Sequence, residues 1–281
     1  VYTNNLPGGA FRGFGAPQGT FAAEMQMNKL AEALDVDPVA LRVRNLLRDK
    51  TLTTMRTPLP DGVSLVEVTE RCARAIGWQQ TEKGAKGAPS SWQRPSSGPA
   101  AGAASTRSRK RSVAPPAEAV HGGIGLAVGF KNVGFSFGYK ENCWAKIELQ
   151  GEGEIERAAV SIGSADVGQG AHTVIRQMAA EALGIPLERV RMATSDTATS
   201  PGSAGSTSAS RTTFMAGNAV REAAGAALRR WRDGERPATA ERTYLAPETT
   251  HFDPETGEGF PNFAYGYVAQ AVQVAVDVET G

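Results

Sequence analysis

The sequence predicts an α+β fold, with mixed sheets and helices packed outside them, divided into two parts. Helical and strand patterns follow one another in mixed order instead of alternating regularly. A stretch rich in Pro, Gly, Ser and Ala separates the two parts at residues 81–119. The chain has 281 residues, of which 41% are hydrophobic, and this is enough apolar material for one large domain or two ordinary ones.

Residues 1–80 are expected to form a glycine-rich loop followed by helices. Asp37 supplies a cap and Pro38 occupies the first helical position after it. Ser64 and Glu67 have the spacing of a capping box, which marks a further helix start. Apolar periodicity and these signals predict three helices, at residues 17–34, 38–47 and 64–76.

Residues 81–119 are predicted to be a flexible linker. Their composition buries too little apolar area to offset the entropy lost on ordering. The basic cluster at residues 107–111 is compatible with a nucleic-acid-binding arm, but five basic residues in one run are weak support for that alternative. The net charge of +1 gives no further reason to expect a nucleic-acid partner.

Residues 120–281 contain both strand and helix signals. Gly184 and Pro186 are stop signals for a helix, and the run from Gln150 to Glu154 is typical of a turn between two strands. The predicted strands cover residues 122–130, 143–149, 155–162, 190–193 and 267–278, and the predicted helices cover 171–183 and 212–231.

Several classes of protein are disfavoured. Cys72 and Cys143 lie far apart without a CxxC partner, so we expect two reduced thiols. The three histidines are scattered and form no zinc-type cluster. No apolar run is long enough to cross a bilayer and no signal core is present, which favours a cytoplasmic location without a membrane partner.

Three glycine-rich loops are the most informative feature. They span residues 8–15, 166–173 and 203–213, and each precedes a predicted helix. A helix start leaves backbone N–H groups without partners, and glycine lets a ligand approach them closely. If the loops converge, they form a pocket of neutral donors for a large polyoxygenated anion, to which Arg12 and Arg211 would add charge. Taken singly, each loop is an ordinary turn before a helix, so convergence is the hypothesis.

The residues of these loops resemble those of the molybdenum hydroxylase family, which includes xanthine dehydrogenases and aldehyde oxidases. Residues 9–18 resemble its arginine-bearing loop, residues 167–173 are similar to its glutamine loop, and residues 208–220 resemble its serine-rich loop. The order is the family's order. The resemblance implies the end of a first molybdenum cofactor-binding lobe at 1–80 and a second lobe at 120–281.

The resemblance also implies a set of site residues. The backbone of Arg12 and of Ala209 would lie beside the molybdenum centre, and Gln169 would hydrogen-bond the pterin. Phe14, Phe137 and Gly138 would form the substrate pocket, where two rings stack on a flat heteroaromatic or an aldehyde. Core packing is the alternative for the two rings. The implied cofactor-binding residues are Arg12, Gly13, Gly168, Gln169, Gly170, Ser208, Ala209 and Ser210.

The activity implied is hydroxylation of an aldehyde or N-heteroaromatic carbon with oxygen from water. The cofactor would be molybdenum-molybdopterin, with or without a nucleotide, and [2Fe-2S] and FAD would sit on partner domains or subunits of an oligomeric complex. The base would be a glutamate of a Gly-x-Gly-Glu motif beyond Gly281, so no catalytic residue is assigned here and this chain alone is expected to be inactive. Glu154 mimics that motif, but its position between two strands indicates a hairpin turn.

Two alternatives remain. A non-catalytic molybdopterin-binding module would keep the same loops, and only residues after Gly281 would distinguish it. A carbon monoxide dehydrogenase-like subunit is disfavoured, because that subgroup carries a cysteine where this chain has Phe14-Gly-Ala-Pro17.

Overall fold

The computed structural model describes residues 4, 12–54, 56–78, 120–194, 196, 198 and 205–281. The predicted linker at 81–119 lies outside the described residues, as do the first residues of the arginine-bearing loop. The chain divides into two compact units: unit 1 comprises residues 1–48, 62–129 and 267–281, and unit 2 comprises residues 49–61 and 130–266.

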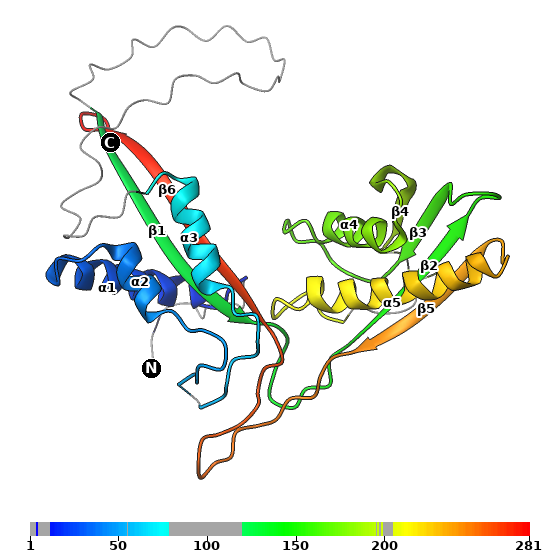
Figure 1. The fold of residues 1–281 in the computed structure, drawn as a ribbon, viewed down its shortest axis with the longest axis horizontal. Coiled ribbons are helices and arrows are strands. Elements are labelled where there is room, and N and C mark those ends of the chain that lie inside the picture. The colour runs from blue at the N-terminus through cyan, green and yellow to red at the C-terminus, as the bar shows by residue number, and fades with distance from the viewer. Residues whose placement is uncertain are drawn as a thin grey trace, which may run out of the picture. The chain divides into compact units, whose positions relative to one another are not determined.

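Unit 2 is built on a four-stranded mixed sheet (Figure 1). Its strands are β2 (Asn142–Gln150), β3 (Arg157–Ser161), β4 (Val190–Ala193) and β5 (Ala238–Leu245), in the order β4-β3-β2-β5. The central strand β2 pairs antiparallel with both neighbours, whereas β3 and β4 are parallel. Because parallel strands need a crossover connection, a helix joins β3 to β4.

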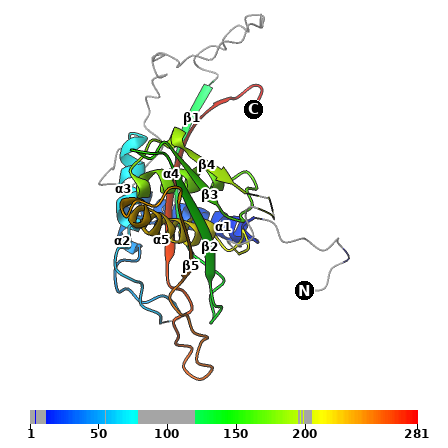
Figure 2. The same cartoon turned by 90° about the vertical axis from the view of Figure 1, so that its right-hand side faces the viewer.

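Two helices, α4 (Ala171–Leu183) and α5 (Thr212–Arg232), pack on one face of this sheet (Figures 1 and 2). A short 3-10 helix at Leu187–Arg189 follows α4. Residues of β2 alternate between this buried face and the other face, as expected for a sheet covered on one side. Its inward residues Cys143, Ala145, Ile147 and Leu149 are fully buried.

The long helix α5 approaches the sheet closely because its buried side is made of small residues. Ala219, Ala223 and Ala227 recur every fourth position, so they lie on one helix face, and all three are fully buried. They join the same apolar core as the inward residues of β2. Unit 2 therefore has a continuous core beneath its loops.

Unit 1 contains α1 (Ala16–Ala33), α2 (Pro38–Asn45), α3 (Leu65–Ala75) and most of a two-stranded sheet formed by β1 (Val120–Asn132) and β6 (Tyr265–Asp277). The fully buried members of its apolar cluster are Val39, Ala73 and Leu126. The opposite face of β6 exposes a stripe of valines, Val268, Val272, Val274 and Val276, which Val278 continues just beyond the strand. This sheet is therefore covered on one face only in the described structure.

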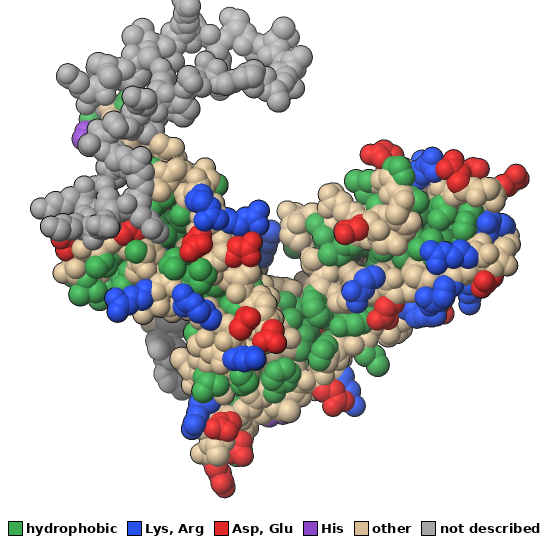
Figure 3. All heavy atoms as spheres, viewed as in Figure 1, with side chains coloured by type: hydrophobic (Ala, Val, Ile, Leu, Met, Phe, Trp, Pro, Cys, Tyr) green, Lys and Arg blue, Asp and Glu red, His purple; other side chains and the backbone are tan. Residues whose placement is uncertain are grey.

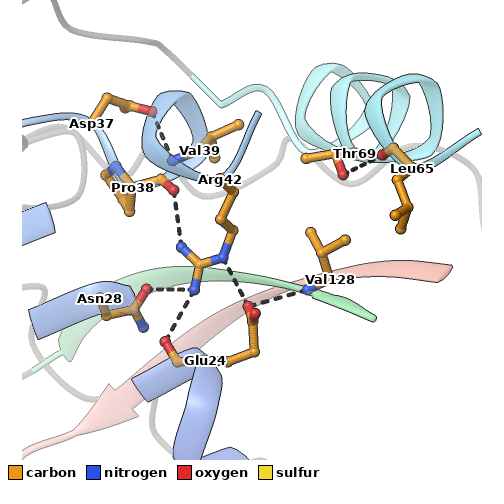
Figure 4. Close-up of polar contacts among 9 residues, drawn as sticks. All are labelled: Glu24, Asn28, Asp37, Pro38, Val39, Arg42, Leu65, Thr69 and Val128. Carbon is orange, nitrogen blue, oxygen red and sulfur yellow. Dashed lines mark hydrogen bonds and ion pairs between the residues drawn. The ribbon is translucent and has the colours of Figure 1, made fainter. Parts of the chain in front are cut away.

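A polar network supplements the small core of unit 1 (Figure 4). The guanidinium of the buried Arg42 on α2 bonds the Glu24 carboxylate at 2.8 Å and the Asn28 side chain at 2.9 Å, both on α1. The same Glu24 carboxylate accepts the Val128 N–H of β1 at 3.2 Å. Arg42 and Glu24 thus hold two helices and a strand together.

The α+β fold of mixed sheets is confirmed, with differences in detail. The α1 stripe that predicted a buried face is largely exposed, since Phe21 is 69% and Leu34 61% accessible; Figure 3 shows hydrophobic side chains at the surface around this helix. The capping box at Ser64 is wrong, because Ser64 makes no side-chain cap bond. Strand β5 was not predicted. The two compact units do not coincide with the two predicted cofactor-binding lobes, 1–80 and 120–281. The division into these lobes stays a prediction.

Candidate functional site

The arginine-bearing loop forms a left-handed turn at the start of α1. Gly13, Phe14 and Gly15 have φ angles of 98°, 48° and 90°. Glycine is required at position 13, because a Cβ there would lie 2.8 Å from the Cδ of Pro17. No side chain caps α1, and Arg12 and Phe14 are both exposed. The turn therefore presents the backbone of the helix start to solvent.

The glutamine loop is organised by a carboxylate that was not predicted. Asp166 accepts backbone N–H bonds from Gly168 at 2.8 Å, His172 at 3.3 Å and Gly170 at 3.4 Å. The bond from Gly168, followed by the others, lowers the pKa of Asp166 below its ordinary value. An ionised carboxylate thus occupies the N-terminus of α4. The carboxylate thus takes up backbone donors that were expected to face an anionic ligand, and binding of such a ligand at this loop stays a prediction.

Gln169 lies between two left-handed glycines, Gly168 and Gly170, with φ angles of 94° and 77°. Its side-chain oxygen accepts the Val167 N–H at 2.6 Å, and its amide nitrogen donates to the Ala165 carbonyl at 3.3 Å. A primary amide has two lone pairs and two N–H donors. Among the described residues, one lone pair and one N–H donor of this amide therefore have no partner and could bind a ligand, while the loop itself orients the amide.

The serine-rich loop ends in two strained residues just before α5. Ala209 and Ser210 have φ angles of 50° and 55°, a conformation that costs non-glycine residues about 1–3 kcal/mol. Within the described residues, neither backbone N–H has a hydrogen-bond partner, and no side chain caps α5. The loop therefore offers adjacent neutral donors beside a helix start.

The side chain of Arg211, which follows this turn, binds other groups of the protein. Its guanidinium is 2% exposed and pairs with Glu141 at 2.5 Å. It also donates to the Asn142 carbonyl at 2.7 Å and to the Ser206 carbonyl at 3.1 Å. The expectation that Arg211 adds charge to an anion pocket is wrong, because Glu141 neutralises it inside the protein.

The aromatic loop is a second strained turn, which follows β1. Ser136 and Phe137 have φ angles of 69° and 53°. Gly138 donates its N–H to the Thr249 hydroxyl at 2.9 Å, which draws a later segment alongside. Phe137 is 45% exposed, and its ring centroid lies 6.3 Å from that of His251 and 5.4 Å from that of Phe252.

Phe137 is therefore a surface ring in an aromatic group and no part of the apolar core. Sequence reasoning missed His251 and Phe252, which lie more than one hundred residues later. Neither residue carries a local signal that would have linked it to Phe137, because the bonds between the two segments form only in the fold.

Hydrogen bonds connect the three loops that lie in unit 2, which are the glutamine, serine-rich and aromatic loops. The Ala165 N–H of the glutamine loop donates to the Thr207 hydroxyl of the serine-rich loop at 3.1 Å. The Gly134 N–H of the aromatic loop donates to the Ala209 carbonyl at 3.0 Å. Gln169, Ser208–Ser210 and Phe137 are thereby gathered in one region. Arg12, Gly13 and Phe14 belong to unit 1, so their convergence with this region stays a prediction.

Glu154 lies in the predicted hairpin turn, which is confirmed. The antiparallel pairing of β2 and β3 reaches Gln150 opposite Arg157, and the turn lies between these residues. Glu154 forms an exposed ion pair with Arg189 at 3.1 Å. A Cβ at Gly151 would lie 2.1 Å from the Glu154 carbonyl, so the turn requires glycine there.

The described part of the chain contains neither a side-chain metal cluster nor a disulfide. It contains no group of three or more His, Cys, Asp or Glu residues that could hold a metal ion, and no helix long and apolar enough to cross a membrane. Both cysteines are free. Cys143 is fully buried, and burial raises the pKa of its thiol to about 11.

Family models match both parts of the chain. A model described as a molybdopterin cofactor-binding domain matches residues 99–235, and a second model with the same description matches residues 1–46. These ranges contain the arginine-bearing, glutamine, aromatic and serine-rich loops.

Curated relatives and solved structures agree. The aldehyde oxidoreductase of Megalodesulfovibrio gigas is 30% identical over 100% of this chain and 29% of its own length. The putative xanthine dehydrogenase molybdenum-binding subunit XdhA of Escherichia coli K12 is 29% identical over 79% of this chain and 26% of its own length. The solved aldehyde oxidoreductase of Desulfovibrio gigas matches 99% of this chain and 28% of that chain, with a TM-score of 0.65 and 26% identity.

Proposed function

Because the chain belongs to the molybdopterin cofactor-binding domain family of xanthine dehydrogenases and aldehyde oxidoreductases, we propose that it forms part of the cofactor site of a molybdenum hydroxylase. The complete enzyme would hydroxylate an aldehyde or an N-heteroaromatic carbon with oxygen from water. The chain spans 29% and 26% of the length of the two relatives above, so this activity belongs to a longer protein.

The observation that carries the proposal is the pair of backbone N–H groups of Ala209 and Ser210, which have no partner among the described residues and are joined to the loop of Gln169 through Thr207. A pterin carries a ring edge of alternating donors and acceptors, which an oriented primary amide can match. The local charges of Asp166 and Arg211 are already engaged with protein groups. The remaining donors of the region are neutral, and they suit a large polar cofactor held by many hydrogen bonds.

The residues of this chain would bind and orient the cofactor, and would not transfer the proton. Gln169 would hold the pterin, and the N–H groups of Ala209 and Ser210 would face the side that carries the metal ligands. Bound molybdopterin supplies the two-electron oxidation of the substrate carbon. The base would be a glutamate outside the 281 residues, and Arg12 with Gly13 would complete the site from unit 1.

The substrate would lie against Phe137. A half-exposed ring beside other aromatic groups favours a flat heteroaromatic or an aldehyde, which it orients by stacking. Phe14 would supply the second ring and Gly138 would leave room beside the first. Electrons would leave through [2Fe-2S] clusters and FAD on partner domains or subunits.

The test uses the complete enzyme complex carrying Gln169→Ala. We expect a loss of molybdenum per protein, measured by elemental mass spectrometry, and a parallel loss of turnover with aldehydes, purines and other N-heterocycles. Gln150→Ala is the matched control, because Gln150 is an exposed amide at the end of β2. Full molybdenum content and full turnover in Gln169→Ala would contradict the proposal.

The same experiment separates the alternative of a non-catalytic module. A wild-type complex that retains stoichiometric molybdopterin but oxidises none of these substrates would favour that module. The isolated 281-residue chain is expected to hold no stoichiometric molybdenum and to show no turnover, since much of the site would come from elsewhere.

A further inference from the structure

We propose that the buried pair Glu141–Arg211 positions the aromatic loop against the serine-rich loop, and that it thereby determines which substrates fit. This inference rests on the proposed function, because it concerns the distance between the substrate ring of Phe137 and the cofactor donors of Ala209 and Ser210. Neither Glu141 nor Arg211 would touch the substrate. Both are positioning residues.

The pair is buried and short. The side chains of Arg211 and Glu141 are 2% and 1% exposed, and their closest nitrogen and oxygen are 2.5 Å apart. Removing one partner of such a pair leaves an uncompensated buried charge, so the geometry of the pair is strongly favoured over alternatives. The aromatic and serine-rich loops both form hydrogen bonds with this pair, so the pair fixes their positions.

On the cofactor side, Arg211 holds the serine-rich loop through its own backbone and its guanidinium. It directly follows Ser210 in sequence, and the guanidinium donates to the carbonyl of Ser206 at 3.1 Å. A Cβ at Gly205 would lie 2.5 Å from the Nη1 atom, so the loop backbone rests directly on the guanidinium. The loop is therefore held at both ends of the segment that carries the free donors.

On the substrate side, Glu141 holds the aromatic loop. Its second carboxylate oxygen accepts the Phe135 N–H at 2.7 Å, two residues before Phe137. A Cβ at Gly134 would lie 2.8 Å from the same oxygen, so glycine is needed for this approach. Gly134 in turn donates to the Ala209 carbonyl, which closes the connection between the loops.

A guanidinium is required because three acceptors must be satisfied at once. Arg211 reaches the Glu141 carboxylate and the carbonyls of Asn142 and Ser206 from different nitrogens of one planar group. A lysine ammonium carries the same charge but is a single point on a flexible stem and cannot reproduce this fork. Arg211→Lys therefore keeps the charge and loosens the loop geometry.

The test measures substrate selectivity in the complete enzyme carrying Arg211→Lys. Misplacement of a positioned group by about 1 Å can reduce the rate on the order of 100-fold. We expect molybdenum content to be retained. The ratio of kcat/KM for a planar N-heterocycle to that for acetaldehyde should fall about 10-fold or more, because acetaldehyde has no ring to stack on Phe137 and depends on that contact less.

Arg176→Lys is the matched control. Arg176 is also in unit 2 and binds backbone carbonyls of Val190 and Leu187, but it lies outside the loops of the site. It should leave the ratio unchanged. Equal losses for both substrates in Arg211→Lys, or equal changes in the two variants, would overturn the inference. A wild-type complex without molybdenum or turnover would instead contradict the proposed function.

If Arg211→Lys does not retain molybdenum, amide hydrogen exchange is compared between the wild-type and Glu141→Gln forms of the complete enzyme, both prepared without cofactor. The glutamine side chain of this variant would keep the size and an acceptor for the Phe135 N–H while removing the charge. The inference requires faster amide exchange in residues 134–138 and 205–210 together, with α5 unaffected. A uniform rise across unit 2 would show that the pair stabilises only the fold.

Discussion

Unit 2 and unit 1 bury their surfaces in different ways. In unit 2, alanines of α5 and inward residues of β2 fill one continuous core, and Ile147 at its centre is fully buried. In unit 1, the fully buried part of the apolar cluster is formed by Val39, Ala73 and Leu126, while valines on the other face of β6 are exposed. Polar bonds from Arg42 and Glu24 connect the helices of unit 1 instead.

This difference bears on the loops that each unit carries. The glutamine, serine-rich and aromatic loops stand on a packed scaffold that resists distortion. The arginine-bearing loop stands at the end of α1, whose attachment depends on hydrogen bonds to Arg42. We therefore expect strained turns in unit 2 to persist without a ligand and the turn at Phe14 to be the more easily displaced.

The largest expected effect is the loss of core volume in unit 2. Ile147→Ala should lower the free energy of unfolding of unit 2 by about 2–5 kcal/mol, because it leaves a cavity between sheet and helices. Urea denaturation followed by tryptophan fluorescence, to which the buried Trp231 of unit 2 contributes, measures this. Val274→Ala on the open face of β6 should change stability by no more than about 0.5 kcal/mol. Similar losses of unfolding free energy in both variants would contradict the difference in packing between the two units.

A smaller and local effect is expected when the polar network of unit 1 is broken. Arg42→Met should cost about 2 kcal/mol, because the Glu24 carboxylate loses a charged partner but keeps some access to water. Amide exchange should accelerate in α1 and stay unchanged in α5. Arg44→Met, an exposed change in the same helix, is the control. Faster exchange throughout the chain would mean that the network supports more than unit 1.

The smallest effect concerns Asp166. Its folded pKa lies below the unfolded value of about 3.9, so its bonds stabilise the glutamine loop above that pH and are lost as the pH falls through the folded pKa. Asp166→Asn should lower the protection of the Gly168 and His172 amides, relative to their intrinsic exchange rates, near neutral pH. The wild-type protein should lose this protection only in acid. Asp253→Asn, which removes a similar loop carboxylate elsewhere, should leave these amides unchanged. Unchanged exchange in Asp166→Asn would contradict this role.

Elements with strong local signals were predicted well. The bounds of α4 and β4 agree with prediction, and for α4 the stop signals Gly184 and Pro186 mark the end of the helix. Strand β5 was missed because its sequence, Ala-Thr-Ala-Glu-Arg-Thr-Tyr-Leu, has only two residues that become buried on the core side. Its pairing with β2 depends on residues almost one hundred positions away.

The site was predicted as a set of residues and not as a set of bonds. Glycines at positions 13, 168 and 170 marked the loops that precede helices, and the structure gives all three a positive φ. Nothing local indicated that Arg211 would pair with Glu141, because that contact spans seventy residues and forms only when β2 and α5 are packed. Patterns along the chain thus identified the loops, while the fold decided which charges remain available.

Each unit contains one cysteine, and this allows the two to be followed separately. Cys143 lies in the core of unit 2, whereas Cys72 is half-buried beside the apolar cluster of unit 1. Alkylation requires a thiolate that is accessible to the reagent, so Cys143 becomes reactive only when unit 2 opens. The rate at which the Cys143 sulfur is alkylated, followed by mass spectrometry over time, therefore reports the opening of unit 2, whereas the half-buried Cys72 is accessible without such opening and serves as the internal reference.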